Sequence, residues 1–196
     1  MTRRPIPLAQ RPWDFAFLAF FLLNLCFITY IVDIEQLVIA NPAHFTYPIW
    51  PPAPLVDMVH NYARTLDPLV LARPPWWKMT IWFDALGFGP FYAASIYAYI
   101  RGRDWIRIPS LLYGASIITI VFIILSEEYA GLHATAHFPI VLLLNLPWII
   151  VPGLIIARMW RSEHPFTTVA SDAATAATTV EGNEVGAAAI DRKAVQ

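Results

Sequence analysis

Four long apolar runs constrain this chain more than any other feature. Each contains 18 or more residues with at most one charged side chain, close to the roughly 20 residues that a helix needs to cross a hydrocarbon core of about 30 Å. The chain is 58% hydrophobic and only 14% charged, a balance too apolar for a soluble domain of this size. The runs therefore predict an all-α membrane protein, a bundle of four transmembrane helices at residues 15–32, 79–100, 108–125 and 138–157.

The placement of Lys and Arg predicts the orientation of this bundle. Cations precede the first run, join the second to the third, and follow the fourth, whereas segment 126–137 has none and carries Glu127 and Glu128. By the positive-inside rule, both termini face the cytosol. The first run is longer than the apolar part of a usual signal peptide and no small-residue cleavage site follows it, so we expect it to be retained.

Composition divides the chain into a membrane domain with two flanking segments. We expect a cytosolic N-terminal segment at 1–13, a four-helix domain at 14–161, and a disordered cytosolic tail at 162–196. From residue 167 onward the tail has no aromatic side chain, so it cannot bury enough apolar surface to become ordered.

The long lumenal connection at 40–75 is rich in Pro and Trp. Its Pro-dense part cannot form a regular helix, but residues 55–66 can form a short amphipathic one. Two interpretations remain open, a lid packed over the outer end of the bundle and an ordinary interfacial loop. The inward face of the short helix would consist of Val56, Val59, Tyr62 and Ala63.

Two aspartates, Asp33 and Asp84, lie within or beside these apolar helices. An ionised Asp at the centre of a spanning helix costs about 2.5 to 3.5 kcal/mol, so such groups usually pair, take up a proton or face a cavity. Counted from the outer helix ends at 1.5 Å per residue, Asp33 lies about 10 Å deep and Asp84 about 12 Å deep. The two carboxyl groups should therefore come level on antiparallel neighbours.

Two adjacent carboxyl groups in a low dielectric cannot both ionise cheaply, so one should hold a proton and donate it to the other in a hydrogen bond. The pair would then carry one net negative charge in an apolar cavity. This suits binding of a cationic amine or proton donation to a sterol-like substrate. In the alternative interpretation, Asp33 snorkels at its helix end and Asp84 bonds a neighbouring backbone or hydroxyl group.

Other polar side chains at similar depth are weaker candidates. Thr29 and Tyr30 precede Asp33, Thr119 lies on the third helix and Asn145 on the fourth. Each could line a site or form an interhelical hydrogen bond. A net charge of −1 indicates no nucleic-acid partner, and a single Cys with no Cys/His cluster indicates no metal site. No nucleotide or catalytic fingerprint is present, so no cofactor is expected.

Five short motifs keep a distinctive order across the four helices. They are Ile28-Thr29-Tyr30-Ile31-Val32-Asp33, Asp67-Pro68-Leu69, Pro74-Pro75-Trp76-Trp77-Lys78, Trp105-Ile106-Arg107-Ile108-Pro109 with Tyr113, and Pro147-Trp148-Ile149-Ile150-Val151-Pro152. In this order they resemble the EXPERA domain superfamily, and within it the sigma-2 receptor (transmembrane protein 97) family. The resemblance covers residues 14–161.

The resemblance implies roles for particular residues. At the position of Asp33 the family has the counter-ion for cationic ligands, and at the position of Asp84 its protonated partner, which is usually Glu. The family's hydroxyl on the third helix falls at Ile120, next to Thr119, and its tyrosine on the fourth helix becomes Trp148. The predicted ligand-binding residues are Asp33, Asp84, Thr29, Tyr30, Thr119, Tyr113, Trp148 and Asn145.

The resemblance also implies a function. It suggests a multi-pass endoplasmic reticulum membrane protein, assembled as a homodimer, that binds sterol or related lipid and cationic amphiphiles. It would regulate sterol or lipid trafficking, or protein delivery to mitochondria. The alternative is a sterol Δ8–Δ7 isomerase of the emopamil-binding type, from the same superfamily. We favour the non-enzymatic function and predict no catalytic residue, because the five histidines lie in loops or at helix ends.

Overall fold

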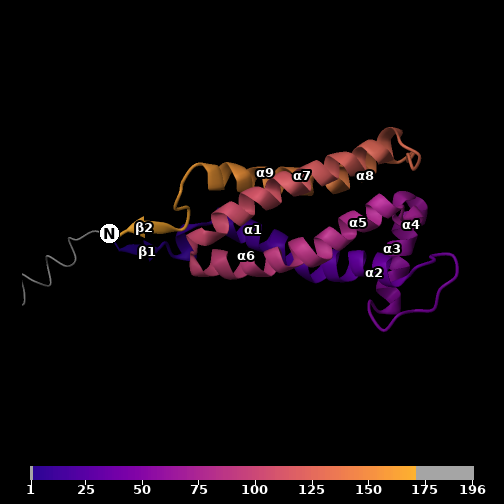
Figure 1. The fold of residues 1–196 in the computed structure, drawn as a ribbon, viewed down its shortest axis with the longest axis horizontal. Coiled ribbons are helices and arrows are strands. Elements are labelled where there is room, and N and C mark those ends of the chain that lie inside the picture. Colours follow the sequence, from indigo (N-terminus) through magenta and orange to yellow (C-terminus); the bar gives the residue numbers. More distant parts are fainter. Residues whose placement is uncertain (1, 171–196) are drawn as a thin grey trace, which may run out of the picture.

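The computed structural model of the chain describes residues 2–170, which are mostly helical (Figure 1). A short two-stranded sheet lies at one end of an elongated helical bundle, beside the N-terminus. The main helices are α1 (Trp13–Leu23), α2 (Ile34–Val38), α3 (Ala53–Thr65), α4 (Leu69–Ala72), α5 (Pro75–Phe83), α6 (Gly89–Arg101), α7 (Arg107–Ala130), α8 (Phe138–Asn145) and α9 (Pro147–Trp160). The other elements are strands β1 (Arg3–Pro5) and β2 (Thr167–Val169), 3-10 helices η1 (Leu8–Gln10) and η4 (Asp104–Ile106), and π-helices η2 (Asn24–Asp33) and η3 (Asp84–Phe88).

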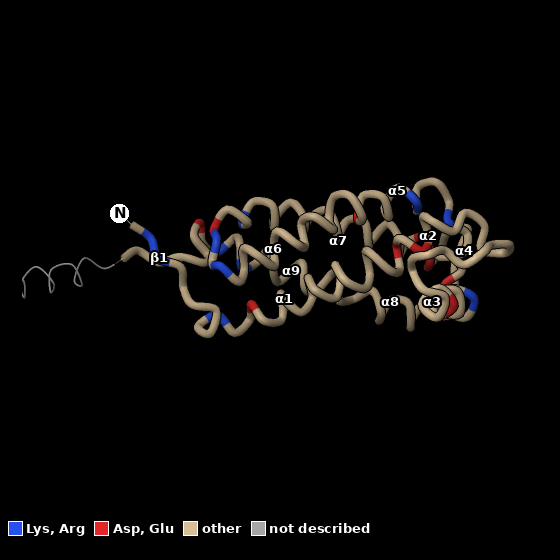
Figure 2. Tube along the Cα trace, turned by 90° about the horizontal axis from the view of Figure 1, so that it is seen from below, with Lys and Arg blue, Asp and Glu red and all other residues tan. Residues whose placement is uncertain are grey.

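Within the described residues, three helices are long and apolar enough to cross a membrane. They are Trp13–Val38, Asp104–Ala130 and Phe138–Trp160, which confirms the helices predicted at 15–32, 108–125 and 138–157. The run predicted at 79–100 is also helical, as part of α5, η3 and α6, and its crossing of the membrane stays a prediction. Figure 2 shows that the charged residues gather toward the two ends of the bundle.

The bundle consists of two packed helix pairs. Helix α1 lies along α6, and α7 lies along α9 (Figure 1). Aromatic rings fill the core within and between the pairs. Phe21 of α1 meets Tyr99 of α6 edge-on at 5.3 Å between ring centroids, and Phe91 of α6 stacks on Tyr113 of α7 at 4.5 Å. Edge-to-face and offset-stacked pairs stabilise such a core beyond the apolar area that they bury.

Two helices contain π-helical segments that meet inside the bundle, because η2 packs against η3. Pro90, just after η3, has no backbone N–H to donate, so the regular α-helical ladder cannot continue through this point. Gly89 allows the two segments to approach closely, since a Cβ at this position would lie 2.9 Å from the Tyr30 hydroxyl. The close approach brings the end of η2 beside the start of η3.

The long connection forms two short helices at the end of the bundle opposite the termini (Figure 1). Helix α3 covers the predicted segment 55–66 and packs against η2 and α4. The predicted inward face is confirmed, since Val56, Val59 and Ala63 are buried and Tyr62 is half-buried. We call residues 53–74 the lid, because the structure supports the first of the two interpretations of this connection.

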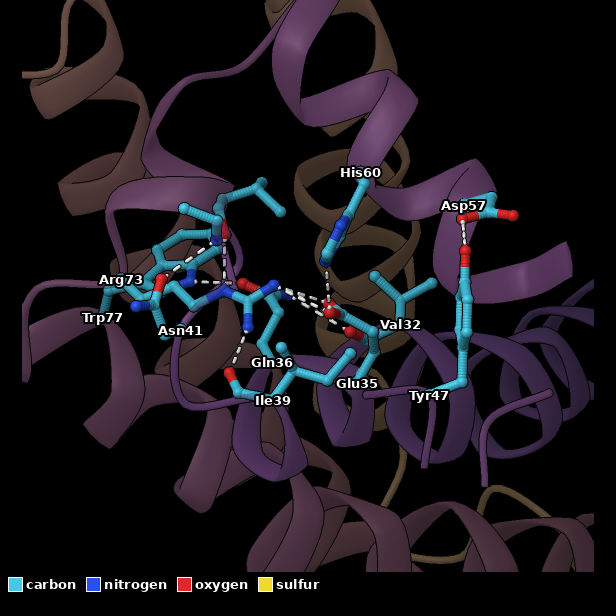
Figure 3. Close-up of polar contacts among 12 residues, drawn as sticks. Val32, Glu35, Gln36, Ile39, Asn41, Tyr47, Asp57, His60, Arg73 and Trp77 are labelled. Atoms are coloured by element: carbon cyan, nitrogen blue, oxygen red, sulfur yellow. Dashed lines mark hydrogen bonds and ion pairs between the residues drawn. The ribbon is translucent and has the colours of Figure 1, made fainter. Parts of the chain in front are cut away.

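A buried ionic network attaches the lid to the end of the first helix (Figure 3). The Arg73 guanidinium donates to both oxygens of Glu35, at 2.9 and 2.8 Å, and to the Ile39 carbonyl at 2.7 Å. His60 Nε2 lies 2.8 Å from Glu35 Oε1. All three ionisable side chains are buried, so the network joins α2, α3 and the residue that follows α4.

Residues 162–170 differ from the predicted disordered tail. Strand β2 pairs antiparallel with β1, with Arg3 opposite Val169. Phe166 is fully buried, its ring centroid lies 4.8 Å from that of Tyr99, and the guanidinium carbons of Arg11 and Arg158 lie 5.1 and 5.3 Å from its centre. One aromatic anchor therefore orders a segment whose composition alone indicated disorder. The rest of the predicted tail, 171–196, lies outside the described residues.

Replacing Arg73 with Ala leaves the Glu35 carboxylate buried without its guanidinium partner. An uncompensated buried charge is costly, so we expect the free energy of unfolding to fall by about 3 to 5 kcal/mol. Denaturant titration in detergent micelles, followed by circular dichroism, measures this change. Arg64→Ala removes an exposed arginine of the same lid and should be nearly neutral. Equal losses in the two variants would refute a stabilising role for the network.

Candidate functional site

A cavity of about 460 Å³ lies between the helices and beneath the lid. Side chains of η2, η3 and α7 form much of its wall, and the lid, α2, α5 and the α8–α9 helix contribute the rest. Most of its lining is aliphatic or aromatic, which is typical of small-molecule sites in proteins. The polar residues of its wall are Asp33, Gln36, Tyr62, Asp67, Thr80, Asp84, Glu128 and Asn145.

Asp33 and Asp84 meet in this cavity, as their depth predicted. Asp33 is the last residue of η2 and Asp84 the first residue of η3, and their carboxyl groups lie within hydrogen-bond reach of each other. No Lys or Arg of the described chain forms an ion pair with either carboxyl group. In such surroundings two touching carboxyl groups share a proton, which leaves one net negative charge on the pair.

Two hydroxyl groups hold Asp84 in place. Thr29, fully buried on η2, donates to Asp84 Oδ2 at 2.5 Å, and the Tyr92 hydroxyl donates to Oδ1 at 3.3 Å. Asp33 accepts no hydroxyl or N–H hydrogen bond within the described chain. Among the protein's own groups the negative charge is therefore best stabilised on Asp84, while Asp33 retains the capacity to accept hydrogen bonds from a ligand.

Asn145 and Trp148 form the wall opposite this pair on the fourth predicted helix. Trp148 Nε1 donates to Asn24 Oδ1 at 2.7 Å, so its polar edge is satisfied within the protein. Asn145 Nδ2 donates to the Val141 carbonyl at 2.9 Å. The indole therefore presents an apolar surface to the cavity. Such a surface suits contact with a lipid or an amphiphile.

Four predicted site residues do not line the cavity, and one of them, Thr29, contributes only through its hydrogen bond to Asp84. Thr119 is exposed on α7 and donates to the Ala115 carbonyl. Tyr30 is also exposed, and its hydroxyl lies close to Gly89. Tyr113 is buried in the aromatic core, where its hydroxyl lies 3.4 Å from that of Tyr92. Besides Thr29, only Tyr113 approaches the acid pair, and it does so through Tyr92, which sequence reasoning missed.

A second pair of carboxyl groups, Asp67 and Glu128, lines the same cavity and was not predicted as a site. Both side chains are buried, with 3% and 1% of the residue exposed, and the two carboxyl groups lie side by side. Burial raises the pKa of Asp67, an effect that its contact with Glu128 and the backbone N–H groups of Leu69 and Val70 partly offset. Burial also raises the pKa of the nearby Tyr62 phenol, and the two acids add to this shift.

The sequence carried a signal for each member of this second pair. Asp67 is an acid beside a proline in an otherwise apolar stretch, but it entered the prediction only as part of a family motif. Glu128 marked the outer side of the membrane, and its neighbour Glu127 carried the same signal although it lies outside this cavity. Distinguishing the two glutamates requires knowing which face of α7 points inward, and no pattern near a helix end fixes that face.

The described histidines belong to other contacts. His60 bonds Glu35 beneath the lid, His133 bonds Glu127 at 2.7 Å and His164 lies 3.2 Å from Asp104 near the sheet. Within residues 2–170 no histidine lines this cavity. The groups available there for proton transfer are therefore carboxyl and phenol groups.

Comparison with known proteins agrees with this architecture. The family description EXPERA (EXPanded EBP superfamily) matches residues 54–159, which is more than half of the chain. A curated relative, Sigma intracellular receptor 2 of Xenopus tropicalis, is 33% identical over 82 residues, or 41% of this chain and 48% of that protein.

The proteins of the same name from Macaca fascicularis and Homo sapiens are each 25% identical over 127 residues, or 58% of this chain and 72% of theirs. The chain thus spans about half of the frog relative's length and more of the primate ones. Because the family match includes the lid and all but the first of the helices that form the cavity, this chain belongs to the EXPERA family, the expanded EBP superfamily.

Proposed function

We propose that this protein is a membrane receptor for cationic amphiphiles and sterol-like lipids, which bind in the cavity beside Asp33 and Asp84. The observation that carries the proposal is the contact between these two carboxyl groups in an apolar cavity without a protein cation. One net negative charge surrounded by aliphatic and aromatic walls complements a molecule with one basic nitrogen and an apolar body.

The hydrogen bonds of the pair support an order of events on binding. Asp84 already accepts from Thr29 and Tyr92, so a ligand ammonium is received by Asp33. The approaching positive charge favours the ionised form of Asp33, and the shared proton moves to Asp84. Asp84 then donates this proton back to Asp33 as a hydrogen bond, which is the division of roles that the resemblance implied.

We further propose that the chain crosses an intracellular membrane, the endoplasmic reticulum, four times with both termini in the cytosol. The distribution of cations supports this topology, and the helical stretch 75–101, next to the three apolar helices, supports a fourth span. The curated relatives are named as intracellular receptors. A regulatory role in sterol or lipid trafficking, or in protein delivery to mitochondria, is the physiological form that we propose for such a receptor.

Asp33→Asn and Asp84→Asn test the acid pair against each other. Asn at 33 removes the charge that receives the ligand, whereas Asn at 84 can still accept from Thr29 and donate to Asp33. We expect Asp33→Asn to weaken binding of a cationic amphiphile at least about tenfold and Asp84→Asn to weaken it less. Radioligand saturation binding on purified membranes measures both.

Asp57→Asn is the control for this pair of variants, because Asp57 is exposed on the lid and accepts from Tyr47 away from the cavity. Its affinity should equal that of the unmodified protein. Unchanged binding in Asp33→Asn, at equal expression, would remove the counter-ion role. Equal losses in the Asp33 and Asp84 variants would remove the proposed order of events.

Glycosylation mapping tests the topology. The chain has no Asn-x-Ser/Thr sequence, so any glycosylation of a variant must occur at the introduced acceptor. Pro42→Ala with Ala43→Thr makes an acceptor of Asn41, which we place in the lumen, and we expect a mass shift that endoglycosidase removes. A second variant, with the same three-residue sequence placed ahead of residue 3, should stay unmodified. Glycosylation of the second variant and not of the first would show that the orientation is the reverse of the one proposed.

The isomerase alternative is also testable. The cavity lacks a histidine within the described chain, so acid–base chemistry there would depend on carboxyl groups. We expect expression of this chain in cells that lack sterol Δ8–Δ7 isomerase to leave the Δ8 sterol unconverted, as measured by gas chromatography of total sterols. Conversion to the Δ7 sterol, lost again in Asp84→Asn, would establish the enzyme function instead.

A further inference from the structure

The Asp67–Glu128 pair has the features of a ligand contact. Glu128 has 1% of its surface exposed and lies on the cavity wall, yet neither of its carboxyl oxygens accepts a hydrogen bond from an N–H or a hydroxyl group of the described chain. Buried polar groups almost always have such partners. A buried carboxyl group on the wall of an apolar cavity, with no partner except another carboxyl group, therefore indicates that something entering the cavity supplies a donor.

The second pair is held as firmly as the first. The backbone N–H of Leu69 donates to Asp67 Oδ1 at 3.1 Å. The Thr135 hydroxyl donates to the Leu66 carbonyl at 2.6 Å, and the Thr135 N–H donates to the Glu128 carbonyl at 2.9 Å. The segment after α7 thus ties the end of that helix to the lid, and this fixes the two acids against each other.

The distance between the two pairs follows from helix geometry. Helices α6 and α7 run antiparallel, and the rings of Phe88 and Tyr92 both pack on Tyr113, at 5.0 and 5.5 Å between centroids. Asp84, about six residues outward of that contact, therefore comes level with about residue 119 or 120 of α7. Ile120 lines the cavity, and Glu128 lies eight residues beyond it, or about 12 Å of helical rise.

The space between the pairs is mostly apolar, and its polar side chains Gln36 and Thr80 form hydrogen bonds within the protein. Ile120, Val121 and Ile124 line this stretch on α7, and Val59 and Val70 line it from the lid side. Each acid pair shares one proton and so carries one net negative charge. The cavity thus presents two negative charges, one near mid-depth and one beneath the lid, with mostly apolar walls between them.

We propose that Asp67 and Glu128 form a second cation subsite, and that the cavity takes an amphiphile with two basic nitrogens separated by an apolar spacer of about 12 Å. This rests on the proposed function, because the first nitrogen occupies the Asp33–Asp84 pair. The second nitrogen donates to Glu128 beneath the lid. A monoamine uses only the first subsite and leaves the second pair unsatisfied.

Paired ligands test this proposal. Each diamine in a series of increasing spacer length is compared with a monoamine in which carbon replaces the outer nitrogen, by competition binding to the purified full-length protein in detergent. With a spacer of about 12 Å, we expect the diamine to bind at least about tenfold more tightly than its monoamine. Diamines with a much shorter spacer should show no such gain.

Variants then identify the residues that give the diamine its higher affinity. Glu128→Gln keeps the shape of the side chain and should bring the diamine-to-monoamine affinity ratio close to one, and Asp67→Asn should also reduce it. Glu127→Gln is the matched control, because Glu127 is the preceding residue, bonds His133 and lies outside the cavity. It should keep the full ratio.

The outcomes separate the two proposals. A monoamine that binds, with no gain for any diamine, overturns the second subsite and leaves the proposed receptor function intact. A gain that persists in both Glu128→Gln and Asp67→Asn also overturns it. Failure of monoamine and diamine alike to bind overturns the receptor function together with this inference. The spacer series on the unmodified protein decides the question even if a variant fails to fold.

Discussion

A carboxyl group buried in an apolar bundle needs a partner that stabilises its charge or takes part in a hydrogen bond. The buried acids of this protein are of two kinds, those paired with a cation of the protein and those paired with another acid. Asp14 is paired with Arg11 and Arg158, and Glu35 with Arg73. These acids have their counter-charge within the protein, and they join helix ends. The two pairs that line the cavity have only other carboxyl groups, hydroxyls and backbone N–H groups beside them. Their missing counter-charge is the feature on which the proposed ligand site depends.

Turning the two acids toward each other depends on the irregular backbone of the first two membrane-domain helices. Asp33 ends one π-helical segment and Asp84 begins another. Such segments are rare and occur often at functional sites, because the extra residue in the turn redirects the side chains around it. The close approach at Gly89 brings the two segments together. The network of Glu35 and Arg73 then fixes the lid over the outer end, so residues of the lid form part of the cavity wall.

The sequence was sufficient to predict how deep a residue lies along its helix, but not which way its side chain points. Three apolar runs, the lid helix and the level meeting of Asp33 with Asp84 were predicted from residue counts alone. The face of a helix that a residue occupies depends on the rotation of the helix about its axis. π-Helical turns change this rotation, and hydrophobic periodicity cannot reveal it when every face of the helix is apolar. For this reason Thr119 was placed in the cavity although it points outward, and Glu128 was treated as a topology signal although it points inward. The pairing of β1 with β2 was missed because two three-residue segments far apart in the chain carry no pattern that links them.

The energetic cost of the unpaired acids argues that both pairs serve binding. Replacing a buried ionisable cluster with well-packed apolar residues is often neutral or stabilising, so a bundle of this kind gains no stability from Asp33, Asp84, Asp67 or Glu128. Within the described chain the pairs bridge no cation, in contrast to Glu35 and Asp14, and only Asp67 holds a helix end, by accepting from the Leu69 N–H at the start of α4. Under the function that we propose, this cost is offset when a positively charged group enters the cavity, and the positions of the two pairs define where the charges of the ligand lie.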